Sequence, residues 1–259
     1  MQEQENNPIP GYPMFALLLA VIVGVIFSVV NELVPFIILG TIAALFLAKG
    51  FFFVNPNDSK VLVLFGDYKG TVKKNGFFWT NPFYAKQAIS LRARNFDSEK
   101  IKVNDLLGNP ILISSILVWR VKDTYKAAFD VDYYESFVKI QTDAAVRKLA
   151  GSYPYDNFDD EQTEITLRSG MQEVNEAMEG ELSERLAISG IEVLEARIGY
   201  LAYAPEIASA MLKRQQAEAI VAARFKIVEG AVGMVELALD ELSKKQVIEL
   251  DEHQKATMV

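Results

Sequence analysis

Two long apolar runs lie near the N-terminus of the chain. Residues 14–30 form 17 positions without a charge, which as a helix would span about 25 Å. Residues 33–48 form a second run, and Asn31 and Glu32 separate the two. One continuous helix would bury Glu32 in lipid at a cost of about 3 kcal/mol. We therefore predict a two-span transmembrane hairpin over residues 14–53, with its turn at Asn31 and Glu32.

Small residues recur at every fourth position in both runs. Such a stripe allows two membrane helices to approach closely. Membrane helices are also generally rich in small residues, and both interpretations stay open. The predicted hairpin-packing residues are Ala16, Ala20, Gly24, Ser28, Gly40, Ala44 and Ala48.

From residue 60 the apolar pattern shortens to that of strands and then alternates with helical spacing. Residues 111–121 are apolar on both faces, as in a central strand covered by helices. Helical spacing follows over 134–150 and 161–187, where Asp159 or Asp160 would cap the second helix, and residues 191–201 alternate again. This order predicts an α+β domain.

A long helix is predicted from Pro205 to about residue 245, because this segment has no further proline and is rich in Ala, Glu and Arg. Its apolar residues recur at alternating spacings of 4 and 3, the pattern of a coiled-coil seam. A helix folded back on its own domain would also explain the pattern. We favour association with neighbouring copies, since the helix is much longer than usual. The predicted oligomerisation residues are Val221, Phe225, Val228, Val232, Val235, Leu239 and Leu242.

Charge is distributed unevenly along the chain, whose net charge is −8. Residues 49–97 carry eight Lys or Arg against three Asp, and residues 98–259 are strongly acidic. Basic residues that follow a span favour the cytoplasmic side, so we expect the globular part in the cytoplasm, at a bacterial inner membrane. The leader 2–7 is acidic and no cleavage motif follows, so we expect the anchor to be retained.

Aromatic residues and lysines lie close to the end of the second apolar run. Core packing explains such aromatics in most domains. The alternative is that the rings lie in the lipid headgroup layer while the lysines attract anionic lipid. The candidate membrane-surface residues are Lys69, Lys73, Lys74, Phe77, Phe78 and Trp79.

The residues that carry most enzyme chemistry are scarce. The chain has no cysteine and a single histidine, His253, in a polar run. Thiolate catalysis, Ser-His-Asp triads and paired-histidine metal sites are therefore excluded. We predict no catalytic, metal or cofactor-binding residue, no cofactor and no nucleic-acid partner. A membrane hydrolase with a Ser-Lys dyad, using Ser59 or Ser90, is the enzyme alternative.

Several short motifs, taken in order, resemble the stomatin/prohibitin/flotillin family, also called SPFH or band 7. They are Phe65-Gly66-Asp67-Tyr68, Gly76-Phe77-Phe78, Asn81-Pro82-Phe83, Val118-Trp119-Arg120-Val121, Ala144-Ala145-Val146-Arg147, Ala204-Pro205-Glu206-Ile207 and Arg214-Gln215-Gln216-Ala217-Glu218. The resemblance covers roughly residues 50–240. It implies an α+β domain on a membrane, lateral assembly into rings or cages, and a role in organising membrane proteins, lipids or proteases, without catalysis.

The predicted organisation is an N-terminal tail 1–13, the hairpin 14–53, an SPFH-like domain 54–204, the oligomerisation helix 205–245 and a C-terminal tail 246–259. We expect a homo-oligomeric scaffold in contact with membrane lipids. An adaptor that binds one partner through its acidic helix without forming rings is the main alternative. The segment 251–259 has no closing apolar cap, which suggests that the sequence is part of a longer protein.

Overall fold

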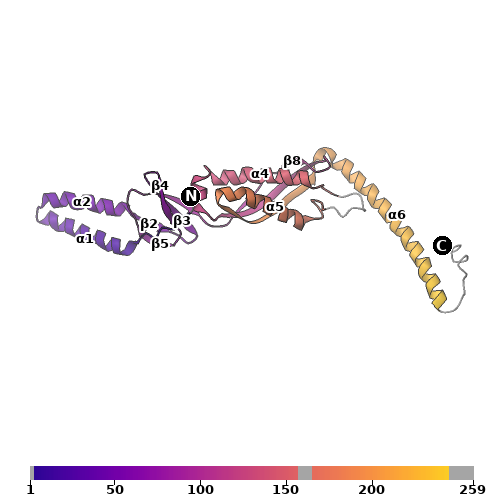
Figure 1. Cartoon of the computed structure of the whole chain (residues 1–259), viewed down its shortest axis with the longest axis horizontal. Coiled ribbons are helices and arrows are strands. Elements are labelled where there is room, and N and C mark those ends of the chain that lie inside the picture. Colours follow the sequence, from indigo (N-terminus) through magenta and orange to yellow (C-terminus); the bar gives the residue numbers. More distant parts are fainter. Residues whose placement is uncertain (1–2, 157–164, 245–259) are drawn as a thin grey trace. The chain divides into compact units, whose positions relative to one another are not determined.

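The computed structural model describes residues 3–156 and 165–244, and it divides into two units (Figure 1). The first unit runs to Leu201 and contains every element from β1 to most of β10. The second begins at Ala202 and contains the long helix α6 (Pro205–Lys244). Helices and strands are mixed along the chain, as the pattern predicts.

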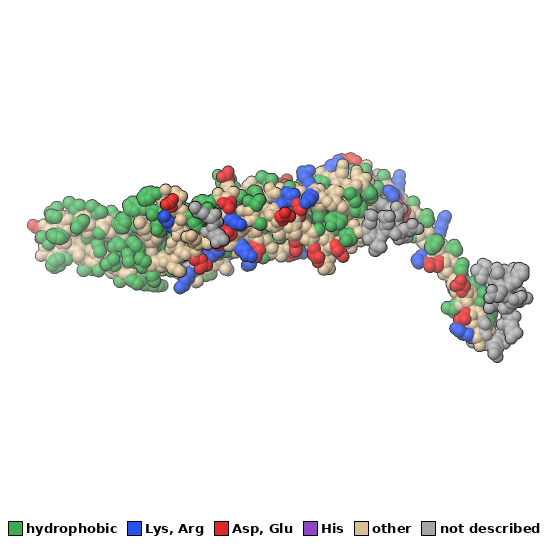
Figure 2. All heavy atoms as spheres, in the orientation of Figure 1, with side chains coloured by type: hydrophobic (Ala, Val, Ile, Leu, Met, Phe, Trp, Pro, Cys, Tyr) green, Lys and Arg blue, Asp and Glu red, His purple; other side chains and the backbone are tan. Residues whose placement is uncertain are grey.

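The N-terminal helices are α1 (Gly11–Val30) and α2 (Val34–Lys49). They pack against each other, and the turn falls at Asn31 and Glu32 as predicted. Glu32 has a positive φ of 56°, and Pro35 lies in the first turn of α2. Helix α1 is 20 residues long and apolar enough to cross a membrane, whereas α2 is a shorter apolar helix. Figure 2 shows hydrophobic side chains over both.

The contact between α1 and α2 differs from the predicted small-residue stripe. Ala16, Ala20 and Gly24 are exposed, as is Ala48, whereas Ser28, Gly40 and Ala44 are at least partly covered. The least exposed positions, apart from the terminal Gly11, are Met14, Leu18, Val21, Val25 and Ser28 in α1 and Ile37, Gly40, Ala43, Ala44 and Leu47 in α2. A step of four residues advances about 40° around a helix. An every-fourth stripe therefore rotates off the contact, while alternating steps of 3 and 4 stay on it.

A first β module is formed by β1, which precedes α1, and by the strands that follow α2, and it contains two small antiparallel sheets. One has the order β1-β5-β2, from β1 (Ile9–Pro10), β5 (Gly76–Trp79) and β2 (Phe51–Val54). The other has the order β4-β3-β6, from β4 (Asp67–Val72), β3 (Asp58–Leu64) and β6 (Ala85–Ser90). Their shared core contains Phe52, Val54, Leu62, Val72 and Phe78.

A second module is built on the long strand β9 (Pro110–Val121). Strands β7 (Arg94–Asp97) and β8 (Ile101–Asn104) pair with it, and β10 (Ile191–Tyr203) completes the sheet. The helices are α3 (Thr124–Phe129), α4 (Tyr134–Ser152) and α5 (Met171–Leu186), followed by the 3-10 turn η1 (Ala187–Ser189). Helix α4 packs on β8, β9 and α5. One face of β9, with Ile111, Ile113 and Leu117, is buried, whereas Leu112, Ile116 and Val118 on the other face are half-buried.

Two boundaries differ from the sequence prediction. The helix expected over 161–187 begins at Met171, because Thr166 to Gly170 form a turn instead. The expected caps Asp159 and Asp160 lie outside the described residues. Helix α1 begins at Gly11, so part of the expected tail 1–13 is ordered as strand and helix.

Candidate functional site

The sheet β1-β5-β2 holds the bases of the two apolar helices. Ile9 and Phe51 both pair with Trp79 across β5, from opposite sides. Helix α1 begins immediately after β1, and only Gly50 separates α2 from β2. A Cβ on Gly50 would lie 2.2 Å from Nε1 of Trp79, so a side chain here would collide with the indole. The same Nε1 donates to the carbonyl oxygen of Leu47 at 2.8 Å, which ties the end of α2 to β5.

Aromatic rings surround these helix bases. The rings of Phe51 and Phe77 stack at 5.2 Å between centroids, and Tyr12 meets Phe77 edge to face. On another part of the module, Phe83 contacts Phe46 and Phe65. We call this set the aromatic collar; it consists of Tyr12, Phe15, Phe46, Phe51, Phe65, Phe77 and Phe83. Rings at the end of an apolar helix suit the boundary between hydrocarbon and water.

The predicted membrane-surface residues separate into different environments. Phe78 is 8% exposed and belongs to the core, so the core-packing interpretation holds for it. Phe77 and Trp79 are half-buried beside the helix bases, where Phe77 contacts Tyr12 and Trp79 bonds to Leu47. Lys69 pairs with Asp67 and Lys73 pairs with Glu3, while Lys74 is exposed.

Of the seven collar residues, only Phe77 was among the predicted membrane-surface residues, and the six that were missed include Phe65 and Phe83. Phe65 is 86% exposed and Phe83 is 60% exposed. Phe65 lies in the turn between β3 and β4 with a φ of 48°, directly before Gly66. An aromatic residue in a tight turn before glycine has no core to enter, and that was the signal available in the sequence.

The N-terminal segment is fastened to the domain by Glu3. Its carboxylate accepts hydrogen bonds from Nζ of Lys73, at 2.7 Å, and from the backbone N–H and hydroxyl of Thr124. Backbone bonds from Asn6 N to Thr71 O and from Thr71 N to Gln4 O continue the attachment. Burial raises the pKa of Glu3, but the hydrogen bonds from Lys73 and Thr124 and the Lys73 charge outweigh it, so the pKa is lowered overall.

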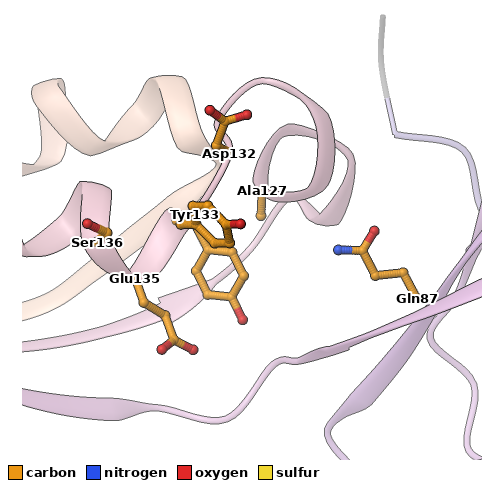
Figure 3. Close-up of a pocket in the computed structure, with 7 residues that line it drawn as sticks. Gln87, Ala127, Asp132, Tyr133, Glu135 and Ser136 are labelled. Carbon is orange, nitrogen blue, oxygen red and sulfur yellow. The ribbon is translucent and has the colours of Figure 1, made fainter.

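A cleft of about 530 Å³ opens between β6 and the start of α4 (Figure 3). It is lined by Gln87, Ala127, Asp132, Tyr133, Tyr134, Glu135 and Ser136. Glu135 pairs with Arg94, whose guanidinium lies 5.5 Å from the Trp119 ring centroid. Burial lowers the pKa of Arg94, but its hydrogen bond to Glu135 and the nearby negative groups raise it overall.

These groups do not form a nucleophile and base pair. Ser136 has carboxylates and tyrosines as its cleft neighbours, without a lysine or histidine in the lining. The hydroxyl of Ser59 is fully buried and donates to the carbonyl of Ile89, so it cannot reach a substrate. The hydroxyl of Ser90 accepts a long bond from Arg92 N. Over residues 3–156 and 165–244, no cluster of three His, Asp or Glu side chains is arranged to hold a metal ion.

The predicted oligomerisation residues lie on α6 of the second unit. Val221, Phe225 and Val228 are exposed, with Phe225 at 69%, and Leu239 and Leu242 are partly covered. Three further apolar residues, Ile220, Ile227 and Met234, are also exposed at intervals of seven. The sequence prediction missed this second set because it followed a single seam.

The order of these modules agrees with a match to a known family. The model of the SPFH domain / Band 7 family matches residues 52–231. The chain belongs to the SPFH domain / Band 7 family. The match starts in β2 and reaches into α6, so it includes both β modules except β1, and more than half of the long helix. No curated protein matches the chain.

Membership of the SPFH family defines the general setting of the chain. The family consists of membrane-associated scaffolds in general terms and is generally non-enzymatic. Together with the apolar helix α1, it points to membrane association. The aromatic collar is consequently the candidate membrane-facing site of this SPFH protein.

Proposed function

We propose that this SPFH protein is a membrane scaffold whose copies assemble side by side through α6. Both α1 and α2 cross the bilayer as a hairpin, with the globular domain in the cytoplasm at a bacterial inner membrane. The assembly organises membrane proteins, lipids or proteases at the membrane surface. The observation that carries this proposal is the width of the exposed apolar face on α6.

Two apolar seams run along α6 in parallel. The first contains Val221, Phe225, Val228, Val232 and Val235. The second contains Ile220, Ile227 and Met234, each one residue before a member of the first seam. On a helix of 3.6 residues per turn, these positions cover roughly 180° of the circumference. A simple two-stranded coiled coil buries a narrower stripe.

A helix with two seams is suited to packing between two neighbours. When the first seam of one copy packs on the second seam of the next, the contact is heterologous. Such a contact repeats until a ring closes or a filament continues. This geometry supports lateral assembly rather than a dimer.

The assembly is tested by aspartate pairs placed on each seam of the full chain in mild detergent and in lipid vesicles. Val228→Asp with Val235→Asp disrupts the first seam, and Ile227→Asp with Met234→Asp disrupts the second. Ala222→Asp with Gly233→Asp is the control, because it adds the same two charges to the face of the helix opposite both seams. We expect each seam variant to lose large assemblies in light scattering and crosslinking, while the control retains them.

Mixing the two seam variants distinguishes the mode of contact. Each mixed pair retains one intact first seam and one intact second seam, so a heterologous contact forms heterodimers that neither variant forms alone. Homodimers of either single variant would contradict the heterologous arrangement. A wild-type chain that stays monomeric in lipid would refute the scaffold and favour the adaptor that binds one partner.

A further inference from the structure

Three lysines gather at the base of α2, outside the set that the sequence singled out. Lys86 of β6 donates from Nζ to the backbone carbonyl oxygens of Lys49 and Gly50, at 3.3 and 3.2 Å. Lys60 of β3 pairs with Ala88, two residues along β6 from Lys86. Residues that face each other across antiparallel strands share a face of the sheet, as do residues two apart. Lys60 and Lys86 therefore lie diagonally on the same face.

These three ammonium groups have no compensating carboxylate. None of them forms an ion pair with another described residue. The acidic residue on the same strand, Asp58, accepts a hydrogen bond from Asn55 instead. By contrast, Lys69 and Lys73 have the carboxylates of Asp67 and Glu3. Among the described residues, three cations without an ion pair thus lie close together at the end of α2, although Lys74 and Arg92 of the same module also form no ion pair.

The pKa of Lys86 is affected by the other two lysines of this group. Burial lowers the pKa of Lys86, and the positive charges of Lys60 and Lys49 lower it further. Capping of α2 explains part of its position, since a cation at a helix C-terminus stabilises the unpaired carbonyls. Capping requires one lysine only and does not account for Lys49 and Lys60. An anion placed among the three would offset their repulsion.

The location indicates which anion is available. Lys86 lies 5.2 Å from the ring centroid of Phe52, and its carbonyl partners close the apolar helix α2. Phe46 and Phe83 of the aromatic collar lie in contact near the same helix end. With the proposed hairpin in the bilayer, this level is that of the lipid phosphates.

We propose that Lys49, Lys60 and Lys86 form a binding site for the phosphate of an anionic phospholipid headgroup. The lipid's acyl chains lie along α2, and its phosphate accepts hydrogen bonds from the three ammonium groups. The site rests on the proposed insertion of α1 and α2, and it gives the scaffold a preference for anionic lipid at each copy.

Trp79 provides a local probe of this site, because its indole is bonded to Leu47 near the end of α2. The full chain is reconstituted in vesicles that contain either brominated phosphatidylcholine or brominated phosphatidylglycerol, with bromine close to the glycerol end of the chain. Bromine quenches tryptophan at short range. Trp119 is 4% exposed in the core of the second module and contributes a constant background.

We expect stronger quenching by the phosphatidylglycerol than by the phosphatidylcholine at equal mole fraction. Lysines near an anionic surface each contribute roughly fivefold to association. Lys49→Gln with Lys60→Gln should therefore lower the preference by roughly tenfold or more, while leaving the Lys86 cap intact. Lys69→Gln with Lys74→Gln is the matched control, with the same change in charge, and should lower it less than about twofold.

The possible failures differ in their signatures. Equal quenching by both lipids, or equal losses in the two lysine pairs, would overturn the lipid site while leaving the inserted hairpin in place. Absence of quenching by either lipid would instead refute the insertion on which the proposal rests. Inorganic phosphate added at constant ionic strength should leave the preference unchanged. If phosphate abolishes the preference, the site takes free phosphate and the assignment to lipid is wrong.

Discussion

Gly40 offers a direct test of the contact between α1 and α2. A Cβ added at Gly40 would lie 2.5 Å from Cγ2 of Val25, well inside van der Waals contact. Valine is β-branched and stiff about χ1, so Cγ2 cannot swing away cheaply. Gly24 lies in α1, and a Cβ there would meet nothing within 4 Å. Gly40→Ala and Gly24→Ala thus make the same chemical change in covered and open positions.

The expected difference follows from two opposing effects. Alanine is favoured over glycine inside a helix by about 0.5–1 kcal/mol, and this applies to both variants. Overpacking at a tight contact costs about 1–3 kcal/mol, and this applies to Gly40→Ala alone. We therefore expect Gly40→Ala to be less stable than Gly24→Ala by about 1–3 kcal/mol.

Unfolding by sodium dodecyl sulfate in mixed micelles measures this difference, with Trp79 fluorescence reporting release of the α2 end from β5. The double variant Gly40→Ala with Val25→Ala removes Cγ2 and should recover much of the loss in steric terms. Equal midpoints for Gly40→Ala and Gly24→Ala would refute the packing of α1 on α2 described above, because the two positions would then be equally open.

Two further predictions concern the domain. Because the pKa of Glu3 is lowered in the folded protein, its attachment is complete above the ordinary pKa of 4.5 and is lost as pH falls below that value through the folded pKa. Hydrogen exchange should show lower protection of the Asn6 amide in acid, or at neutral pH in Glu3→Gln. Glu5→Gln is the control and should leave this protection unchanged. Gly190 has a φ of 67°, and a Cβ there would lie 2.4 Å from the Asp123 carbonyl oxygen, so Gly190→Ala should cost about 2–4 kcal/mol in urea unfolding. Gly151 lies in open space within α4, so Gly151→Ala should instead stabilise the domain by up to about 1 kcal/mol. Equal losses in the two variants would contradict the close approach at Gly190.

The local sequence pattern was sufficient to predict the elements that depend on residues close together in the chain. The turn at Asn31 and Glu32 was predicted because a charge interrupts an apolar run, which is a purely local signal. The strand at 111–121 and the long helix from Pro205 were predicted for similar reasons, and they correspond to β9 and α6. The coiled-coil role of α6 stays a prediction.

Contacts between distant residues could not be predicted in this way. Glu3 meets Thr124 across 121 positions, and β1 pairs with Trp79 across 70. Nothing in a short polar leader distinguishes a fastened segment from a free one. The lysine cluster could not be predicted for the same reason, because Lys49, Lys60 and Lys86 come from three separate elements. The sequence prediction chose Lys69, Lys73 and Lys74 because they lie near the aromatic residues. In the fold, Lys69 and Lys73 have acidic partners, whereas the cluster of Lys49, Lys60 and Lys86 has no ion pair among the described residues.

The strand order β1-β5-β2 sets the distance between the ends of the two apolar helices α1 and α2. Strands β1 and β2 flank β5, so they lie two strand spacings apart, about 10 Å. Two packed helices have axes about 8–10 Å apart. The sheet therefore presents the ends of α1 and α2 at the separation that their packing requires. With both ends held at this width, the hairpin proposed above would respond to a thicker or thinner bilayer by tilting as one body, and β5 would tilt with it.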